Sequence, residues 1–209
     1  MKCISFNCRG MASASKKLAL HRLFEIEPID IIMLQEALGS TDLITSTLNS
    51  ISLGWHYMEM DAMGRSGGLA IGYNPKSIRV QASWGGHGFM GLDLFLAKLG
   101  TNLRVINIYG PCQRRENFWQ HLFNFTIFSP DHIILGGDLN FSLDFSESWG
   151  SMAQVDSISG YMSNLLEQHN FVDVPMNKPL PTWRNKTVGE VALARRLDRF
   201  LNNVASASL

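Results

Sequence analysis

The sequence carries few charged residues and no net charge. Charged side chains make up 17% of the 209 residues, and the 18 basic and 18 acidic residues cancel at pH 7. A positive field over the whole surface, which would attract nucleic acid, is therefore excluded, and any contact with a polyanion has to be local. The candidates are three basic clusters, Lys16/Lys17, Arg114/Arg115 and Arg195/Arg196/Arg199. Taken alone, each cluster also fits an ordinary solvated face.

Cysteine is scarce, and long hydrophobic runs are missing. Cys3, Cys8 and Cys112 are odd in number and show no C-x-x-C spacing, which argues against a disulfide framework and a zinc site. Asn7 and Arg9 interrupt the N-terminal apolar stretch too early for a signal peptide, and no later run approaches the roughly 18 apolar residues of a membrane span. We therefore expect an intracellular protein, nuclear or cytoplasmic, without disulfide partner or membrane contact.

The chain is rich in hydrophobic residues, which make up 45% of it, enough for one sizeable core and too much for disorder. Apolar strand-like runs alternate with helix-like periodic runs, without internal repeats. The expected strands are 2–7, 30–35, 69–73, 78–82, 92–99, 103–109, 132–135, 171–174 and 196–201, and the expected helices are 16–25, 115–125 and 160–169.

This order of elements predicts a mixed α/β (α+β) fold. Successive strands without intervening helices imply antiparallel pairing, and two packed, largely antiparallel mixed sheets flanked by helices would form a four-layer sandwich. We assign residues 1–201 to this domain. Residues 202–209, NNVASASL, are mostly small and polar and are expected to form a flexible tail.

Polar residues repeatedly stand at the ends of the apolar strands. They are Asn7 after ISF, Gln35 and Glu36 after IIML, Tyr109 after VINI, and Asp138 with Asn140 after HIILGG. One such placement is ordinary turn chemistry. Four of them on one sheet edge would converge on a rim that could hold a metal ion and a phosphate.

Seven segments along the chain carry a family resemblance. They are FNCRGM, LQEAL, GRSGGLAIGYN, INIYGPC, GGDLNFSL, PTWRN and RRLDRFL. In this order they resemble the endonuclease/exonuclease/phosphatase (deoxyribonuclease I-like) family, most closely the endonuclease domains of non-LTR (LINE-type) retrotransposons of plant genomes. The resemblance implies Mg²⁺-dependent hydrolysis of phosphodiesters that nicks DNA, with Mn²⁺ as a possible substitute.

The resemblance also implies roles for single residues. Glu36 resembles the principal metal carboxylate, and Asn7 resembles the asparagine that supports the metal site. Asp138 resembles the residue that orients or deprotonates the attacking water, Asn140 the phosphate contact, and Tyr109 the phenol that reaches the scissile phosphate. Alternation in an extended segment would place the side chains of Asp138 and Asn140 on one side. A turn cap at Asn7 and a solvated rim hydroxyl at Tyr109 are the structural alternatives.

Trp183 and Asp198 complete the matched set. By resemblance, Trp183 lies near the floor of the site in contact with substrate, and Asp198 supports the catalytic histidine by accepting its second ring proton. A core position is the alternative for Trp183. For Asp198 the alternative is an ion pair with Arg196 or Arg199.

The sequence also departs from the family pattern. The final Ser-Asp-His motif is not found in the eleven residues after Asp198 (209 − 198), and Asp131-His132 precedes the GGDLN strand. Arg9 stands where abasic-site nucleases carry an acid. We therefore expect a C-terminally truncated domain that lacks its last strand and its histidine. Losing one such charge-stabilising donor costs roughly 3–4 kcal/mol, or 10²–10³ in rate.

Two other functions fit the same residues. One is a catalytically inactive relic or nucleic-acid-binding fragment. The other is a phosphomonoesterase or phosphodiesterase of the same superfamily that acts on inositol phosphates or lipid head groups.

Overall fold

The computed structural model describes residues 1–11, 13–37, 41–61, 67–96, 100–124, 132–187 and 191–203. Some expected features fall on other residues: positions 64–66 of the GRSGG segment, the end of the strand expected at 92–99, the end of the helix expected at 115–125, Asp131, and 204–209 of the tail. They lie outside the described residues. No helix in the described ranges is both long enough and apolar enough to cross a membrane.

The first sheet has four strands in the order β1 (Cys3–Asn7), β2 (Ile31–Gln35), β4 (Leu69–Tyr73) and β3 (His56–Met60). β1 and β2 run parallel, whereas β4 is antiparallel to both of its neighbours. One face packs on α1 (Ala14–Ile26) and α2 (Thr41–Ile51). Side chains of β2 alternate, because Ile32 and Leu34 join this helical layer while Ile31 and Met33 face the second sheet.

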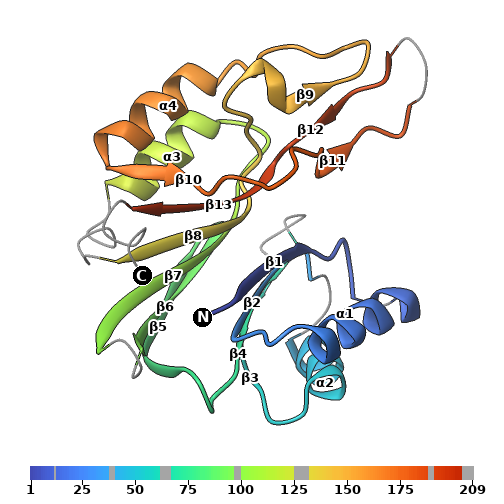
Figure 1. Ribbon diagram of the computed structural model, residues 1–209, viewed down its shortest axis with the longest axis vertical. Coiled ribbons are helices and arrows are strands. Elements are labelled where there is room, and N and C mark those ends of the chain that lie inside the picture. The colour runs from blue at the N-terminus through green and yellow to red at the C-terminus, as the bar shows by residue number, and fades with distance from the viewer. Residues whose placement is uncertain are drawn as a thin grey trace.

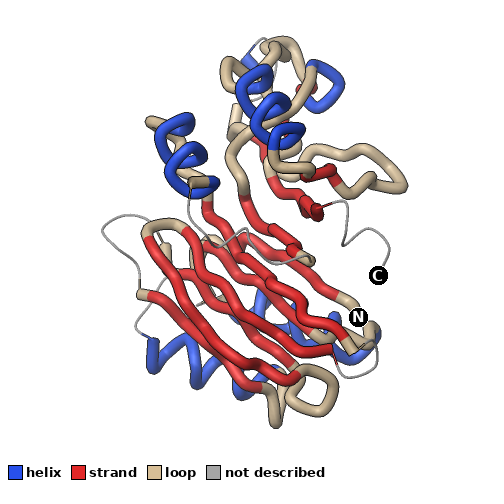
Figure 2. Tube along the Cα trace, turned by 90° about the vertical axis from the view of Figure 1, so that its left-hand side faces the viewer, coloured by secondary structure: helices blue, strands red, loops and turns tan. Residues whose placement is uncertain are grey.

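The second sheet has six strands in the order β10 (Phe171–Asp173), β13 (Asp198–Asn203), β8 (Ile133–Asp138), β7 (Thr101–Tyr109), β6 (Phe89–Leu96) and β5 (Arg79–Gly86). Only β7 and β8 pair in parallel. The outer face packs on α3 (Arg115–Phe123) and α4 (Ser159–Gln168) around the fully buried Trp119. Figure 2 shows the long strands running side by side.

The four layers are visible in Figure 1, with α1 and α2 outside one sheet and α3 and α4 outside the other. Three apolar clusters separate the layers, one beneath each pair of helices and one between the sheets. The expected class, a four-layer α/β sandwich of two mixed and largely antiparallel sheets, is confirmed. Its sheet-on-sheet core follows from strands that are apolar on both faces.

A small third sheet projects beside the sandwich (Figure 1). It contains β11 (Trp183–Arg184), β12 (Ala194–Arg195) and β9 (Ser148–Trp149), the last of which follows the short 3₁₀ helix η2 (Phe145–Glu147). A buried ion-pair cluster anchors this region: Arg196 and Arg199 both bind Glu147 and Asp173. Four charges that neutralise one another are tolerated in a buried position because each keeps a partner.

Several predicted boundaries differ from the structure by a few residues: β5 ends at Gly86, β6 begins at Phe89, β7 at Thr101 and β13 at Asp198. Two further differences, at the ends of β8 and β13, have a visible cause. The expected strand ended at Leu135, but β8 continues to Asp138 because Gly137 (φ 141°) carries no Cβ, which would lie 1.9 Å from the carbonyl oxygen of Ile108. The tail was expected from residue 202, but β13 extends to Asn203. Asn202 still pairs with Ile134, and the side-chain oxygen of Asn203 accepts a hydrogen bond from the Ile133 amide.

Candidate active site

Strand register brings three of the predicted site residues together at one end of the six-stranded sheet. The parallel pairing of β7 with β8 sets Tyr109 opposite Asp138, and the antiparallel pairing of β13 with β8 sets Asp198 opposite Asp138. Along β8, Ile134 and Gly136 face the four-stranded sheet. Asp138 therefore faces that sheet too, because side chains of a strand alternate.

Asn7 and Glu36 approach Asp138 from the four-stranded sheet. Asn7 pairs with Gln35 at the end of β1 and β2, and Glu36 follows with a left-handed backbone (φ 50°). The Asn7 side-chain amide donates to Glu36 Oε1 and to Asp138 Oδ2, both at 2.8 Å. One amide thus joins the two carboxylates, and the two sheets, across the opening of the sandwich. As placed, Asn7 supports the carboxylates with its nitrogen, and its oxygen accepts the Arg9 amide.

The loop after Asn7 is held by a lysine whose role the sequence did not reveal. The Lys16 ammonium donates to the carbonyl oxygens of Cys8, Arg9 and Gly10 at 2.7, 2.9 and 3.2 Å. Arg9 and Gly10 both have positive φ, 44° and 87°. Lys16 had been considered a solvated face or a polyanion contact, but it serves as the clamp of this strained loop.

Burial and charge raise the pKa values of the acidic groups in the site. Burial raises the pKa of Asp138, a residue only 6% exposed, against the opposing hydrogen bond from Asn7. Burial, together with the Asp138 carboxylate, raises the pKa of Asp198 to about 6. Burial and the Glu36 carboxylate, with which the Tyr109 phenol forms a hydrogen bond, also raise the pKa of Tyr109. The phenol is therefore a neutral donor at physiological pH.

Asn140 reaches the site by a turn and not by strand alternation. β8 ends at Asp138, and Asn140 has a left-handed backbone (φ 54°). The backbone N–H of Asn140 donates to Asp138 Oδ1 at 3.3 Å, and its side-chain nitrogen donates to the Gly110 carbonyl. The prediction that alternation would align the two side chains is wrong, because the turn itself brings the backbone of Asn140 back onto Asp138.

Trp183 lies across a hollow from Asn140. Cys112, Arg115, Arg195 and two leucines complete the lining of this hollow, which measures about 280 Å³. Trp183 is half-buried, so the core position considered for it is wrong. The side-chain oxygen of its neighbour Thr182 accepts hydrogen bonds from the backbone amides of Leu197 and Asp198, at 2.9 and 3.0 Å. These bonds connect the segment that carries Trp183 to the start of β13.

Most of the basic clusters are paired inside the fold. Arg115 forms a two-pronged ion pair with Asp156, whose side chain is 1% exposed. The proposed ion pairs of Asp198 with Arg196 or Arg199 are not formed, because both arginines bind Glu147 and Asp173. The positive charge that acts on Asp138 and Asp198 comes instead from Arg9, which counters the rise in the pKa of each.

The donor atoms of the site suit a hard divalent cation. Glu36 and Asp138 offer carboxylate oxygens, the ligands that such a cation prefers. Among the described residues, no group of three or more His, Cys, Asp or Glu side chains is placed to hold a metal ion. An ion held by Glu36 and Asp138 would keep several waters. Mg²⁺ is usually bound in this way, and Mn²⁺ shares its preference for oxygen.

Comparison with known proteins agrees with this geometry. Residues 4–206 match the Endonuclease/Exonuclease/phosphatase family, and the chain belongs to that family. A search of curated proteins gives no match.

Solved structures share the fold at low identity. The endonuclease domain of TRAS1, a telomere-specific non-LTR retrotransposon, has a TM-score of 0.74 at 14% identity over 99% of this chain and 87% of that chain. A 3′ phosphatase from Neisseria, solved with a product DNA hairpin, has a TM-score of 0.77 at 18% identity, covering 100% and 88%. An AP endonuclease from Leishmania major has a TM-score of 0.75 at 16% identity, covering 99% and 80%.

Proposed function

We propose that this chain is a DNA-nicking endonuclease domain that depends on Mg²⁺ or Mn²⁺ and derives from a non-LTR retrotransposon of the type common in plant genomes. The observation that carries the proposal is the Asn7 amide that bridges Glu36 and Asp138 at 2.8 Å each. It sets a carboxylate for a metal ion beside a second, buried carboxylate, as metal-assisted attack of water on a phosphate requires.

In the proposed reaction each residue has one task. Glu36 would hold the ion, whose chemistry there would be to neutralise charge on the phosphate. Asp138 takes the proton of the attacking water; burial raises its pKa, which makes it a better base at neutral pH. In the structure the Tyr109 hydroxyl donates to Glu36, and with Glu36 on the ion it would turn to a phosphate oxygen. The second N–H of the Asn140 side chain would also donate to the phosphate, since the first already binds Gly110. Trp183 contacts the substrate beside Asn140.

Asp198 is proposed to orient an imidazole that stabilises charge on the phosphate. Asp138, Thr182 and Arg9 influence the pKa of its carboxylate, and no described histidine is among these residues. We therefore expect slow hydrolysis by these residues alone, because one charge-stabilising donor contributes about 10²–10³ in rate.

The test is relaxation of supercoiled plasmid in Mg²⁺. We expect slow conversion to nicked circles that Asp138→Ala abolishes, whereas Asp144→Ala, which removes an exposed carboxylate of the η2 turn, leaves the rate unchanged. Nicking that survives Asp138→Ala, or that needs no divalent ion, would contradict the proposal. Faster release of phosphate from inositol phosphates than nicking of DNA would favour the phosphatase alternative, and DNA binding without any hydrolysis would favour the inactive relic.

A further inference from the structure

Lys16 lies on α1, and its ammonium group packs against the loop that follows β1. Its Nζ atom donates to the carbonyl oxygens of Cys8, Arg9 and Gly10 at 2.7, 2.9 and 3.2 Å. An ammonium group has three N–H donors, so these bonds use all of them inside the protein. Lys16 therefore has no donor left for a phosphate, and any part it takes in the proposed reaction is an indirect one.

The loop of residues 8–10 depends on a cation to keep its shape. Arg9 and Gly10 both have a left-handed backbone, with φ of 44° and 87°. This conformation is unfavourable for arginine, so other contacts have to hold it. The three carbonyl oxygens also converge on one point, where they would repel one another if no positive charge stood between them. Without the Lys16 ammonium we therefore expect the loop to relax into another conformation.

The same loop holds both residues that the four-stranded sheet contributes to the proposed metal site. The Gly10 amide donates to the Glu36 carbonyl at 2.8 Å, and Glu36 has a left-handed backbone itself (φ 50°). The Arg9 amide donates to the side-chain oxygen of Asn7 at 3.1 Å. This bond turns the Asn7 nitrogen toward the carboxylates of Glu36 and Asp138. The position of both residues thus depends on the loop that Lys16 holds.

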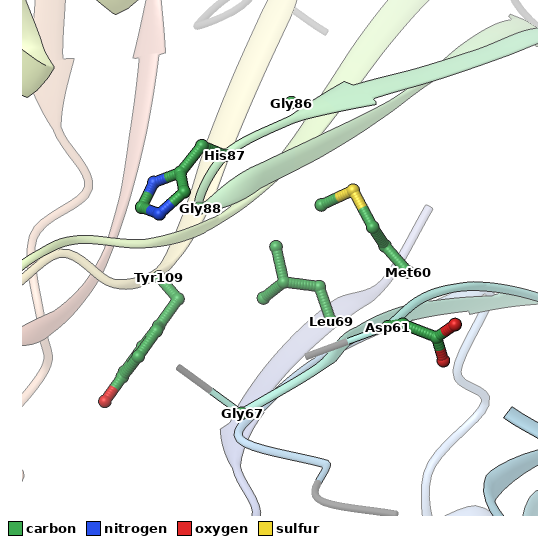
Figure 3. A pocket seen from close by; sticks show the side chains of 8 residues that line it. All are labelled: Met60, Asp61, Gly67, Leu69, Gly86, His87, Gly88 and Tyr109. Carbon is green, nitrogen blue, oxygen red and sulfur yellow. The ribbon is translucent and has the colours of Figure 1, made fainter. Parts of the chain in front are cut away.

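Glu36 has a second anchor, which does not involve Lys16. The Ala37 amide donates to the Gly68 carbonyl at 3.0 Å. The residues on either side of Gly68 line a small hollow, about 20 Å³, together with Tyr109 (Figure 3). Loss of the anchor on the Lys16 side would therefore leave this part of the chain attached to the sandwich. We expect it to shift the Glu36 side chain and not to unfold the protein.

We propose that Lys16 is a positioning residue for the divalent cation: it fixes the 8–10 loop and, through this loop, the Asn7 amide and the Glu36 carboxylate. The proposal rests on the cation-binding part of the proposed function and adds a residue that does not touch the ion. Charge and position act in opposite directions here. Loss of a positive charge near the site would by itself tighten the binding of a cation, whereas release of the loop weakens it.

The test measures Mg²⁺ affinity by isothermal titration calorimetry in the unmodified chain, Lys16→Met and Lys17→Met. We expect Lys16→Met to lower the affinity about 10–100-fold, as loss of an outer support of a metal ligand does. Lys17→Met removes an equal charge about 100° further around α1 and should bind at least as tightly as the unmodified chain. An affinity of Lys16→Met equal to that of Lys17→Met would overturn the inference.

A metal-free measurement separates this inference from the proposed function. In NMR spectra without Mg²⁺, the side-chain N–H signals of Asn7 report its bonds to Glu36 and Asp138. We expect these signals to move toward those of a solvent-exposed asparagine in Lys16→Met and to stay in place in Lys17→Met. Such a shift supports the inference even if the unmodified chain binds no Mg²⁺, a result that contradicts only the metal assignment. Unmoved signals in Lys16→Met, together with Mg²⁺ binding that Glu36→Gln abolishes, uphold the metal assignment and overturn the inference.

Hydrogen exchange of the Gly10 amide in the unmodified chain needs no substitution. If the loop and the ion are coupled, Mg²⁺ must slow this exchange, because coupling between two sites is reciprocal. The Asn74 amide, which donates to the Asp30 carbonyl at the other end of β2, is the control and should exchange at the same rate with and without Mg²⁺. Bound Mg²⁺ that leaves the exchange of Gly10 unchanged would overturn the role of the loop.

Discussion

The Gln35 side chain donates to the side-chain oxygen of Asn107 at 2.6 Å, and both residues are fully buried between the two sheets. The nitrogen of Asn107 in turn donates to the carbonyl oxygens of Leu34 and Ala70, each at 3.0 Å. One amide of the six-stranded sheet is thereby bonded to two strands of the four-stranded sheet. Gln35 precedes Glu36, and Asn107 lies two residues before Tyr109, so this bridge fixes the spacing of the candidate site.

Replacing Asn107 with leucine should lower the free energy of unfolding by about 3–9 kcal/mol, because the Leu34 carbonyl, the Ala70 carbonyl and the Gln35 amide each lose a partner at about 1–3 kcal/mol. Urea denaturation measures the change. Asn102→Leu, on an exposed position of the same strand, should stay within about 0.5 kcal/mol of the unmodified chain.

A double-mutant cycle tests whether Gln35 and Asn107 act together. Gln35→Leu combined with Asn107→Leu should cost about 1–2 kcal/mol less than the sum of the single changes, because the second change removes a group that the first left unpaired. Strict additivity would show that the two side chains do not form the bridge.

Glu36→Gln should abolish binding of Mg²⁺ and Mn²⁺, since the substitution keeps the shape of the side chain and removes the charge that the ion requires. Isothermal titration calorimetry measures the loss. Glu25→Gln, an exposed change on α1, is the matched control and should bind as the unmodified chain does. Undiminished Mg²⁺ affinity in Glu36→Gln would remove the basis for the metal assignment.

The site was partly predictable because Glu36, Tyr109 and Asp138 are polar residues at the ends of apolar strands. Several such residues at one sheet edge indicate a functional site. The structural role of Asn107 was not predicted, because this residue does not lie at the end of a strand. It stands inside an apolar strand, and its partner Gln35 is 72 residues away, a separation that no local pattern encodes. The role of Lys16 was missed for a different reason: its three carbonyl partners are near in sequence, but they belong to a loop whose backbone the sequence does not specify.

Among the elements, α2 and β3 were not predicted. The α2 sequence TDLITSTLNSI is rich in serine, threonine and isoleucine, which are weak helix formers. The helix forms because its Ile44, Leu48 and Ile51 side chains pack into the apolar cluster beneath it. The two-residue strands β9, β11 and β12 exist only because they pair with one another, and β12 reaches across a long stretch of chain to β9, as Ala194 pairs with Trp149. Tertiary packing, and not propensity, decides such elements.

Arg9→Gly should raise the pKa of both Asp138 and Asp198, because the guanidinium lowers each of them in the present structure. Glycine fits the positive φ of 44° at this position, so the loop should keep its shape. Carboxyl ¹³C shifts followed through a pH titration report the two groups. Unchanged titration curves would show that Arg9 does not act on the site.

Asp198→Asn should stabilise the metal-free protein above pH 6. The folded state holds the Asp198 proton more tightly than the unfolded state, with a pKa near 6 against an ordinary 3.8, so this group favours folding below pH 4 and loses that contribution as the pH rises through 6. Two pKa units at about 1.4 kcal/mol each set an upper limit of about 3 kcal/mol, which solvent screening reduces. Thermal melts should show a gain at pH 7.5 that vanishes at pH 4.

Free imidazole should accelerate nicking by the unmodified chain, because Asp198 is proposed to orient an imidazole and the described residues that act on it offer none. An added imidazole that accepts this orientation can donate to the phosphate as charge develops, and the full value of such a donor, about 10²–10³ in rate, is the ceiling for the effect. The measurement is the plasmid nicking rate against imidazole concentration at constant pH and ionic strength. A bulky buffer of similar pKa should give no acceleration, and Asp198→Asn should lose the response while Asp138→Ala stays inactive throughout. Acceleration that is equal in Asp198→Asn and in the unmodified chain would mean that imidazole acts from solution, and the role proposed for Asp198 would be wrong.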